Sequence, residues 1–143
     1  YDASGLLPVL RENFWAAFTS DMMTEEEIRI VCERTSYTLD THTAVAYRVA
    51  EDYRRETGDM RPMIVLSTAS PYKFGASVLH ALGKDTDGLD EFTLMECLHM
   101  QSGMEIPARL AALREAKVLH DGICERDGMR TAVLSFAGHK KKQ

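Results

Sequence analysis

The sequence has few of the features that mark disulfide-rich, membrane-spanning or nucleic-acid-binding proteins. It contains three cysteines, Cys32, Cys97 and Cys124, at wide spacings and without a Cys-x-x-Cys pair. This pattern predicts free thiols in a reducing compartment and no zinc site. No apolar stretch approaches the roughly 18 residues that a membrane-spanning helix needs. The 22 acidic and 17 basic residues give a net charge of −5 without a basic stripe, so we expect no nucleic-acid or membrane partner.

The first and last residues of the sequence are polar or charged in large part. Residues 1–4 do not show the charged and apolar pattern of a secretion signal, and we therefore expect a cytoplasmic protein. The chain starts with Tyr1 rather than Met, which leaves open whether an upstream portion exists. The basic run over residues 139–142 is typical of a solvated tail.

The chain does have enough apolar side chains for a core. Of its 143 residues, 45% are hydrophobic and 27% are charged, which fits one globular domain or a part of one. Apolar residues recur at helical spacing in most of the sequence. The second helix is expected to begin with a capping box, Thr24 to Glu27, and residues 84–89 are expected to form a loop. The spacing predicts the other helices over residues 5–18, 43–56, 71–82, 90–101, 107–116 and 124–136.

Residues 63–66, Met-Ile-Val-Leu, show a different pattern. A short continuous apolar run predicts a strand at about residues 63–67, buried on both faces as in a parallel sheet. A single strand cannot satisfy its own backbone hydrogen bonds, so its neighbours are expected to come from another chain or from residues outside this one. The fold class is therefore predicted as part of an α/β domain, mainly helical on its own. Its exposed strand edges are expected to be covered by another copy, through self-association, or by the chain's own helices.

Polar side chains gather at two predicted helix starts. Residues 67–71, Ser-Thr-Ala-Ser-Pro, follow the predicted strand and precede a helix, which is where ligands bind in open α/β sheets. Residues 39–44, Leu-Asp-Thr-His-Thr-Ala, precede a helix with small residues on one side. The alternative for both clusters is helix capping alone: Ser70 caps one helix, Asp40 or Thr41 caps the other, and His42 is a surface histidine.

Both clusters resemble motifs of bacterial threonine synthases. Residues 37–46, Tyr-Thr-Leu-Asp-Thr-His-Thr-Ala-Val-Ala, are similar to the family stretch Y-x-L-D-P-H-T-A-V-A. Residues 65–74 are similar to the segment T-A-[HS]-P-x-K-F, and residues 106–136 resemble the family's tail. The motifs occur in the family's order and at a similar separation. Thr41 stands where the family usually has proline.

The resemblance implies the C-terminal portion of a pyridoxal-phosphate enzyme with the tryptophan-synthase-β-like fold, fold type II. Family members convert O-phospho-L-homoserine and water to L-threonine and phosphate. Thr68 corresponds to the hydroxyl residue that faces the pyridine nitrogen of the cofactor, and Asp40, His42 and Thr43 correspond to residues that line its ring. Lys73 either meets a phosphate or is solvated. We expect residues 1–83 to belong to the cofactor domain and residues 84–143 to form a helical extension packed on it.

Two parts of the family's cofactor site have no counterpart in this chain. The sequence contains no Phe-Lys-Asp motif, which holds the family's Schiff-base lysine, and no glycine-rich phosphate loop. No catalytic residue is therefore assigned, the isolated chain is expected to be inactive, and its expected partner is the N-terminal part of the same enzyme. Two alternatives stay open: a non-catalytic helical binding module derived from the fold, and an enzyme of the same fold acting on another amino acid.

Overall fold

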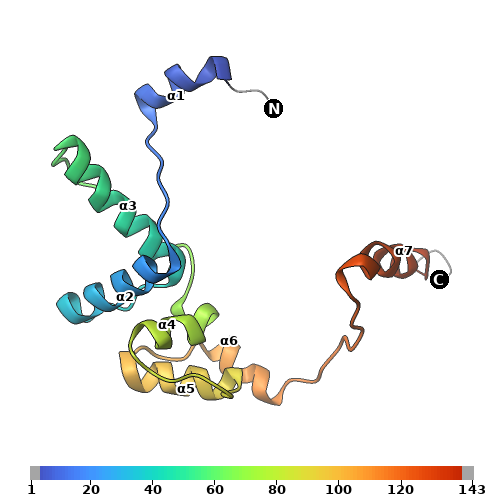
Figure 1. Ribbon diagram of the computed structural model, residues 1–143. Helices are drawn as coiled ribbons and strands as arrows, with labels where there is room; N and C mark the ends of the chain where they lie inside the picture. The colour runs from blue at the N-terminus through green and yellow to red at the C-terminus, as the bar shows by residue number, and fades with distance from the viewer. Residues whose placement is uncertain (1–3, 140–143) are drawn as a thin grey trace. The chain divides into compact units, whose positions relative to one another are not determined.

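The computed structural model describes residues 4–139, which belong to two units divided between residues 111 and 112. The described residues form helices and contain no strand (Figure 1). The second unit contains η3 (Ala112–Glu115), η4 (Arg126–Gly128) and α7 (Met129–His139). The first unit contains η1 (Ser4–Leu6), α1 (Leu7–Asn13), α2 (Asp21–Thr35), α3 (Thr41–Thr57), η2 (Pro71–Phe74), α4 (Gly75–Ala81), α5 (Glu91–Ser102) and α6 (Ala108–Ala111).

The core of the first unit lies among four helices. Helix α2 packs against α3 and α4, and α4 packs against α5 (Figure 1). Helix α3 enters this core through its first turn, where Ala44 is fully buried. The other buried apolar residues are Ile28, Val31, Leu39, Tyr72, Val78, Leu79, Ala81, Leu94, Met95 and Leu98. The core therefore holds the start of α3 in place, next to the first of the two predicted motifs.

Two predicted helices are confirmed, and in the structure each of them ends at a glycine. Helix α3 begins after Asp40 and ends at Gly58, whose φ of 71° is a left-handed conformation that glycine adopts without steric cost. Helix α5 begins after Asp90 and ends at Gly103 with the same geometry. Ser70 caps η2 as predicted, and Pro71 occupies its first turn.

The predicted strand at residues 63–67 is wrong. Residues 62–68 have no regular secondary structure, and the side chains of Ile64 and Leu66 are 90% and 71% exposed rather than buried. Among the described residues there is no neighbouring strand that could pair with this segment, and an apolar run without a pairing partner has no reason to form a strand. Without this strand there are no strand edges at residues 63–67, and self-association through them is no longer expected. The prediction of a mainly helical chain is confirmed.

The first two predicted helices differ from the structure at their ends. The helix predicted over residues 5–18 stops at Asn13, and Phe14 is extended. Helix α1 has no buried residue, so no tertiary packing stabilises a longer helix there. Helix α2 is capped by Ser20 rather than Thr24: the Ser20 hydroxyl accepts a hydrogen bond from the Met23 amide. The Thr24 hydroxyl instead donates to the Ser20 carbonyl at 2.9 Å.

The helices predicted near the C-terminus are shorter than expected. Residues 107–116 contain α6 and η3 in place of one helix, and the helix predicted over residues 124–136 begins as η4 before α7. The change to α7 follows Gly128, whose low helix propensity explains the irregular start. Within residues 4–139, none of the helices combines the length and apolar character that crossing a membrane requires. The boundary expected after residue 83 stays a prediction.

A partly buried ion pair joins α2 to α3. The guanidinium of Arg48 lies 3.4 Å from the Glu27 carboxylate and 3.3 Å from the Asp52 carboxylate. The Glu27 side chain is 8% exposed and the Arg48 side chain 20% exposed. A carboxylate buried to this extent depends on its cation, because an unpaired charge in the interior is strongly unfavourable.

We expect Arg48→Leu to lower the free energy of unfolding by about 3 kcal/mol, since the substitution leaves the Glu27 charge buried without its partner. Arg29→Leu is the matched control, because the Arg29–Glu33 pair is exposed at both ends (47% and 62%) and such pairs contribute less than about 1 kcal/mol. Urea unfolding of the two variants measures the difference. Equal effects would show that the α2–α3 pair contributes no more than a surface ion pair.

Candidate functional site

The carboxylate of Asp40 organises the start of α3. Its Oδ1 accepts hydrogen bonds from the amides of His42 at 2.9 Å and Thr43 at 3.3 Å. Its Oδ2 accepts a hydrogen bond from the Thr43 hydroxyl. The Asp40 side chain is fully buried and Thr43 is 4% exposed. Asp40 is therefore the cap of α3, as one of the two open alternatives predicted, but a cap enclosed by the core.

The Thr43 hydroxyl also reaches the second motif. It lies 3.3 Å from the Ser67 hydroxyl, and this hydrogen bond joins residues that are 24 positions apart in the sequence. A second contact runs in parallel, because the His42 ring lies against the Phe74 ring with centroids 4.9 Å apart. The two sequence motifs, one at the start of α3 and one over residues 65–74, are thus brought side by side.

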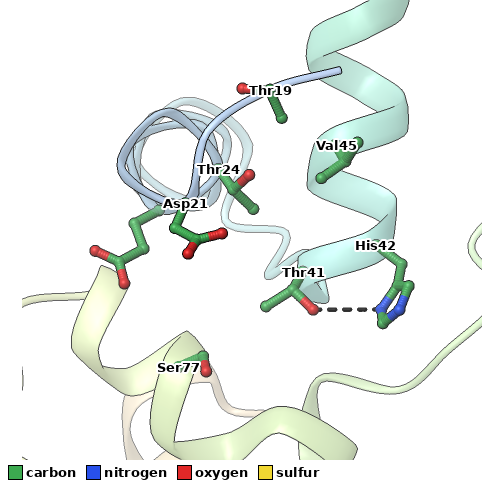
Figure 2. A pocket seen from close by; sticks show the side chains of 8 residues that line it. Thr19, Asp21, Thr24, Thr41, His42, Val45 and Ser77 are labelled. Carbon is green, nitrogen blue, oxygen red and sulfur yellow. Dashed lines mark hydrogen bonds between the residues drawn. The ribbon is translucent and has the colours of Figure 1, made fainter. Parts of the chain in front are cut away.

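The imidazole of His42 lies at the surface, with its side chain 62% exposed. Its Nδ1 is 3.3 Å from the Thr41 hydroxyl and 3.6 Å from Asp40 Oδ1 (Figure 2 shows the Thr41 contact). His42 can therefore offer its ring face or its second nitrogen to a ligand while Asp40 and Phe74 hold it in place.

Thr68 follows Ser67 directly and is exposed. Its hydroxyl has no hydrogen-bond partner among residues 4–139. Lys73 is exposed too, and its Nζ lies 5.5 Å from the centre of the Phe74 ring. The residues after Thr68 are better fixed, because Ser70 caps η2 and Tyr72 is buried.

The Tyr72 hydroxyl anchors this motif to the loop after α5. It donates to the Met104 carbonyl at 2.6 Å, and His99 Nδ1 lies 2.6 Å from the same oxygen. Burial raises the pKa of the Tyr72 hydroxyl, and the nearby Glu105 carboxylate raises it further. The hydroxyl therefore keeps its proton, and with it this hydrogen bond, to a higher pH than an ordinary tyrosine.

Comparison with known proteins shows where these motifs belong. The family model described as "Threonine synthase, C-terminal" matches residues 43–120, more than half of the chain. The chain belongs to this family. It is also similar to a protein named threonine synthase from Methylobacillus glycogenes, with 45% identity over 58 residues. That alignment covers 41% of this chain and 12% of the relative, so the chain spans only a small part of the relative's length. The resemblance drawn from the sequence is confirmed.

In this threonine synthase C-terminal segment, Thr43 and Thr68 lie inside the residues that match the family, whereas Asp40 and His42 lie just before them. The structure brings Asp40, His42 and Thr43 together and places Thr68 next to the Thr43–Ser67 contact. Their assignment as cofactor-binding residues stays a prediction.

A pocket of about 430 Å³ opens between α2, the start of α3 and α4 (Figure 2). Of the four predicted site residues, His42 alone lines it. Hydroxyls and two carboxylates dominate its wall, and one of these carboxylates, Glu25, pairs with His80 at 3.1 Å. The other lining residues are Thr19, Asp21, Thr24, Thr41, Val45 and Ser77. Because Thr43 and Thr68 do not line this pocket, it is distinct from the Thr43–Ser67 contact.

Ser67 belongs to the polar cluster over residues 67–71 but is not one of the predicted site residues, and its contact with Thr43 spans 24 positions. The chain contains a second copy of the capping pattern, with which the cap of α3 can be compared. Asp90 caps α5 as Asp40 caps α3: it accepts hydrogen bonds from the amides of Phe92 and Thr93 and from the Thr93 hydroxyl. Asp90 is exposed and Asp40 is buried. The hydrogen bonds that both caps share belong to helix capping, and the burial of Asp40 and the contact with Ser67 are specific to the candidate site.

We expect Asp40→Ala to lower the free energy of unfolding by about 2 to 4 kcal/mol, because it removes a helix cap and leaves the buried Thr43 hydroxyl without its acceptor. Asp90→Ala, which removes the exposed copy of the same cap, is expected to cost about 1 kcal/mol. Chemical unfolding of both variants tests this. A loss as small for Asp40 as for Asp90 would show that burial adds nothing to the cap.

Proposed function

We propose that this chain forms one wall of the active site of a pyridoxal-phosphate-dependent threonine synthase. The complete enzyme would have the tryptophan-synthase-β-like fold and would convert O-phospho-L-homoserine and water to L-threonine and phosphate. The observation that carries the proposal is the contact between the two motifs, Thr43 to Ser67, inside the segment that matches the threonine synthase family. Polar residues from distant parts of the chain meet there, as an active site requires.

Thr68 is the residue that we assign to the cofactor's pyridine nitrogen. Its hydroxyl is exposed and has no partner among residues 4–139, so it is free to bond a ligand, and the residues present fit this role. When bound, pyridoxal phosphate supplies an electron sink for the substrate's carbanion. A neutral hydroxyl at the ring nitrogen stabilises the unprotonated ring, whereas a carboxylate would favour protonation, and Thr68 would thereby moderate the electron sink.

Asp40, His42 and Thr43 would form the side of the site next to the cofactor ring. The buried Asp40 carboxylate uses its two oxygens on the backbone and on Thr43, which makes it a group that orients others. His42 is the member of this trio with an exposed side chain, held between Asp40 and Phe74. We infer that His42 contacts the ligand directly and that Asp40 sets the position of the helix start.

The remaining parts of the site would come from the N-terminal part of the same enzyme. The matched segment covers 12% of the M. glycogenes relative, and no Phe-Lys-Asp motif occurs in the chain. We therefore propose that the covalent lysine, the phosphate loop and the groups that select O-phospho-L-homoserine lie outside these 143 residues. The absence of the lysine motif also supports the alternative, a non-catalytic helical module.

In the complete enzyme, we expect Thr68→Val to reduce turnover about 5- to 150-fold, because the ring nitrogen loses its partner and an unmade buried hydrogen bond costs about 1 to 3 kcal/mol. The matched control is Thr57→Val at the end of α3, where the hydroxyl bonds its own helix through the Tyr53 carbonyl. Steady-state kinetics and a melting curve are measured for both. Unchanged turnover in Thr68→Val would remove Thr68 from the cofactor site.

The isolated 143-residue chain is expected to form no covalent adduct with pyridoxal phosphate, because it lacks the family's lysine motif. Absorbance spectra after mixing and desalting should show no stoichiometric band at about 410–430 nm, the region of lysine-bound cofactor. A one-to-one band that maps to a single lysine of this chain would contradict the proposal that the lysine lies elsewhere in the enzyme.

A further inference from the structure

Residues 62–69 have a single hydrogen-bonded connection to the helices. They adopt no regular secondary structure, and the described part of the chain shows one hydrogen bond to them, between the Ser67 and Thr43 hydroxyls at 3.3 Å. The neighbouring fixed points lie outside this segment: Arg61 is held by Asp59 before it, and Ser70 caps η2 after it. Between these points, Met63, Val65 and Ala69 are half-buried, and Ser67 is the residue that is hydrogen-bonded to a helix.

The far end of this connection is buried and hydrogen-bonded. Thr43 is 4% exposed, its hydroxyl is bonded to the fully buried Asp40 carboxylate, and the amides of the same turn bond that carboxylate as well. Thr43 follows the cap in the first turn of a 17-residue helix whose next residue, Ala44, is fully buried. Ser67 is thus tied to the buried first turn of α3.

The second Asp-x-x-Thr cap shows that this arrangement exceeds what capping needs. Thr93 bonds Asp90 at 2.8 Å in the same pattern, and among the described residues its hydroxyl bonds no other segment. Thr43 occupies the equivalent position in α3 and in addition contacts Ser67. The extra contact is directed at the residue immediately before Thr68.

We infer that Ser67 is a positioning residue, which fixes the Thr68 hydroxyl through the chain Ser67–Thr43–Asp40. The inference rests on the proposed function, since it assigns a purpose to the place of Thr68. Ser67 touches no reacting group in this arrangement. It restricts the backbone next to Thr68, so that Thr68 presents its hydroxyl in one direction and loses less conformational freedom when a ligand binds.

The first test uses the 143-residue chain without cofactor. Backbone ¹⁵N relaxation is expected to show a lower order parameter for Thr68 in Ser67→Ala and in Thr43→Val than in the unmodified chain. Thr93→Val removes the equivalent hydroxyl of α5 and should leave Thr68 unchanged. Ser67→Thr keeps the hydroxyl and should restore the order of the unmodified chain. A Thr68 amide that is equally mobile in all variants would overturn the inference.

The second test uses the complete enzyme and measures the dissociation constant for pyridoxal phosphate as well as KM and kcat. Ser67→Ala is expected to weaken cofactor binding about three- to tenfold, the equivalent of one ordinary hydrogen bond, and Ser67→Thr to restore it. A loss of cofactor binding in Ser67→Ala that Ser67→Thr does not restore would contradict a role of the hydroxyl.

The two proposals fail in different ways. If Thr68→Val leaves cofactor binding and turnover unchanged, the proposed role of Thr68 is wrong, whatever the relaxation data show. If Thr68→Val impairs both but Ser67→Ala changes neither the mobility of Thr68 nor cofactor affinity, Thr68 acts in the site without positioning by Ser67, and the further inference alone is overturned.

Discussion

The burial of one carboxylate, that of Asp40, determines the arrangement of the candidate site. A charge without solvent is stable only when hydrogen bonds replace the lost water, and Asp40 obtains these from two amides and one hydroxyl of the next three residues. This requirement fixes the first turn of α3. The Thr43 hydroxyl oxygen then lies within hydrogen-bond distance of the Ser67 hydroxyl, and the His42 ring lies against the Phe74 ring. The contact between the two motifs follows from satisfying this carboxylate.

The rest of the unit supports this turn without adding to the site. The first turn of α3 contributes Thr43 and Ala44 to the buried residues, and the Arg48–Glu27 pair attaches the next turns to α2. Tyr72 performs the equivalent task for the second motif by bonding the Met104 carbonyl beyond α5. Each motif is therefore anchored to the core separately, and the hydrogen bond that joins them is the weaker, partly buried one between Thr43 and Ser67.

The predictions made from the sequence were correct where the stabilising interactions are local in sequence, and failed where they join distant residues. Helices α3 and α5 were predicted closely because an Asp cap, an apolar stripe and a terminal glycine all lie within the helix and its ends. The strand at residues 63–67 was predicted wrongly, because an apolar run forms a strand only beside another strand, and its own residues do not encode that partner. The Thr43–Ser67 contact was missed for a related reason. The two residues are 24 positions apart, and the sequence pattern does not show that they are close in space.

The segment that contains Thr68 also exposes large apolar side chains. If the proposed function holds, contact between this segment and the remainder of the enzyme is coupled to ligand binding. Ile64 and Leu66 are 90% and 71% exposed, and Leu66 directly precedes Ser67. Exposed apolar side chains favour binding of another surface that buries them, since burial of each one contributes about 1.5 to 3 kcal/mol to the free energy of association. If the remainder of the enzyme covers these side chains, the same contact encloses Thr68 and removes water from its hydroxyl. A hydrogen bond from Thr68 to the cofactor would then gain strength as the segment becomes buried, because the local dielectric falls. Burial of the segment and binding of the cofactor would thus be coupled. Before the segment is buried, Ser67 would hold Thr68 in position.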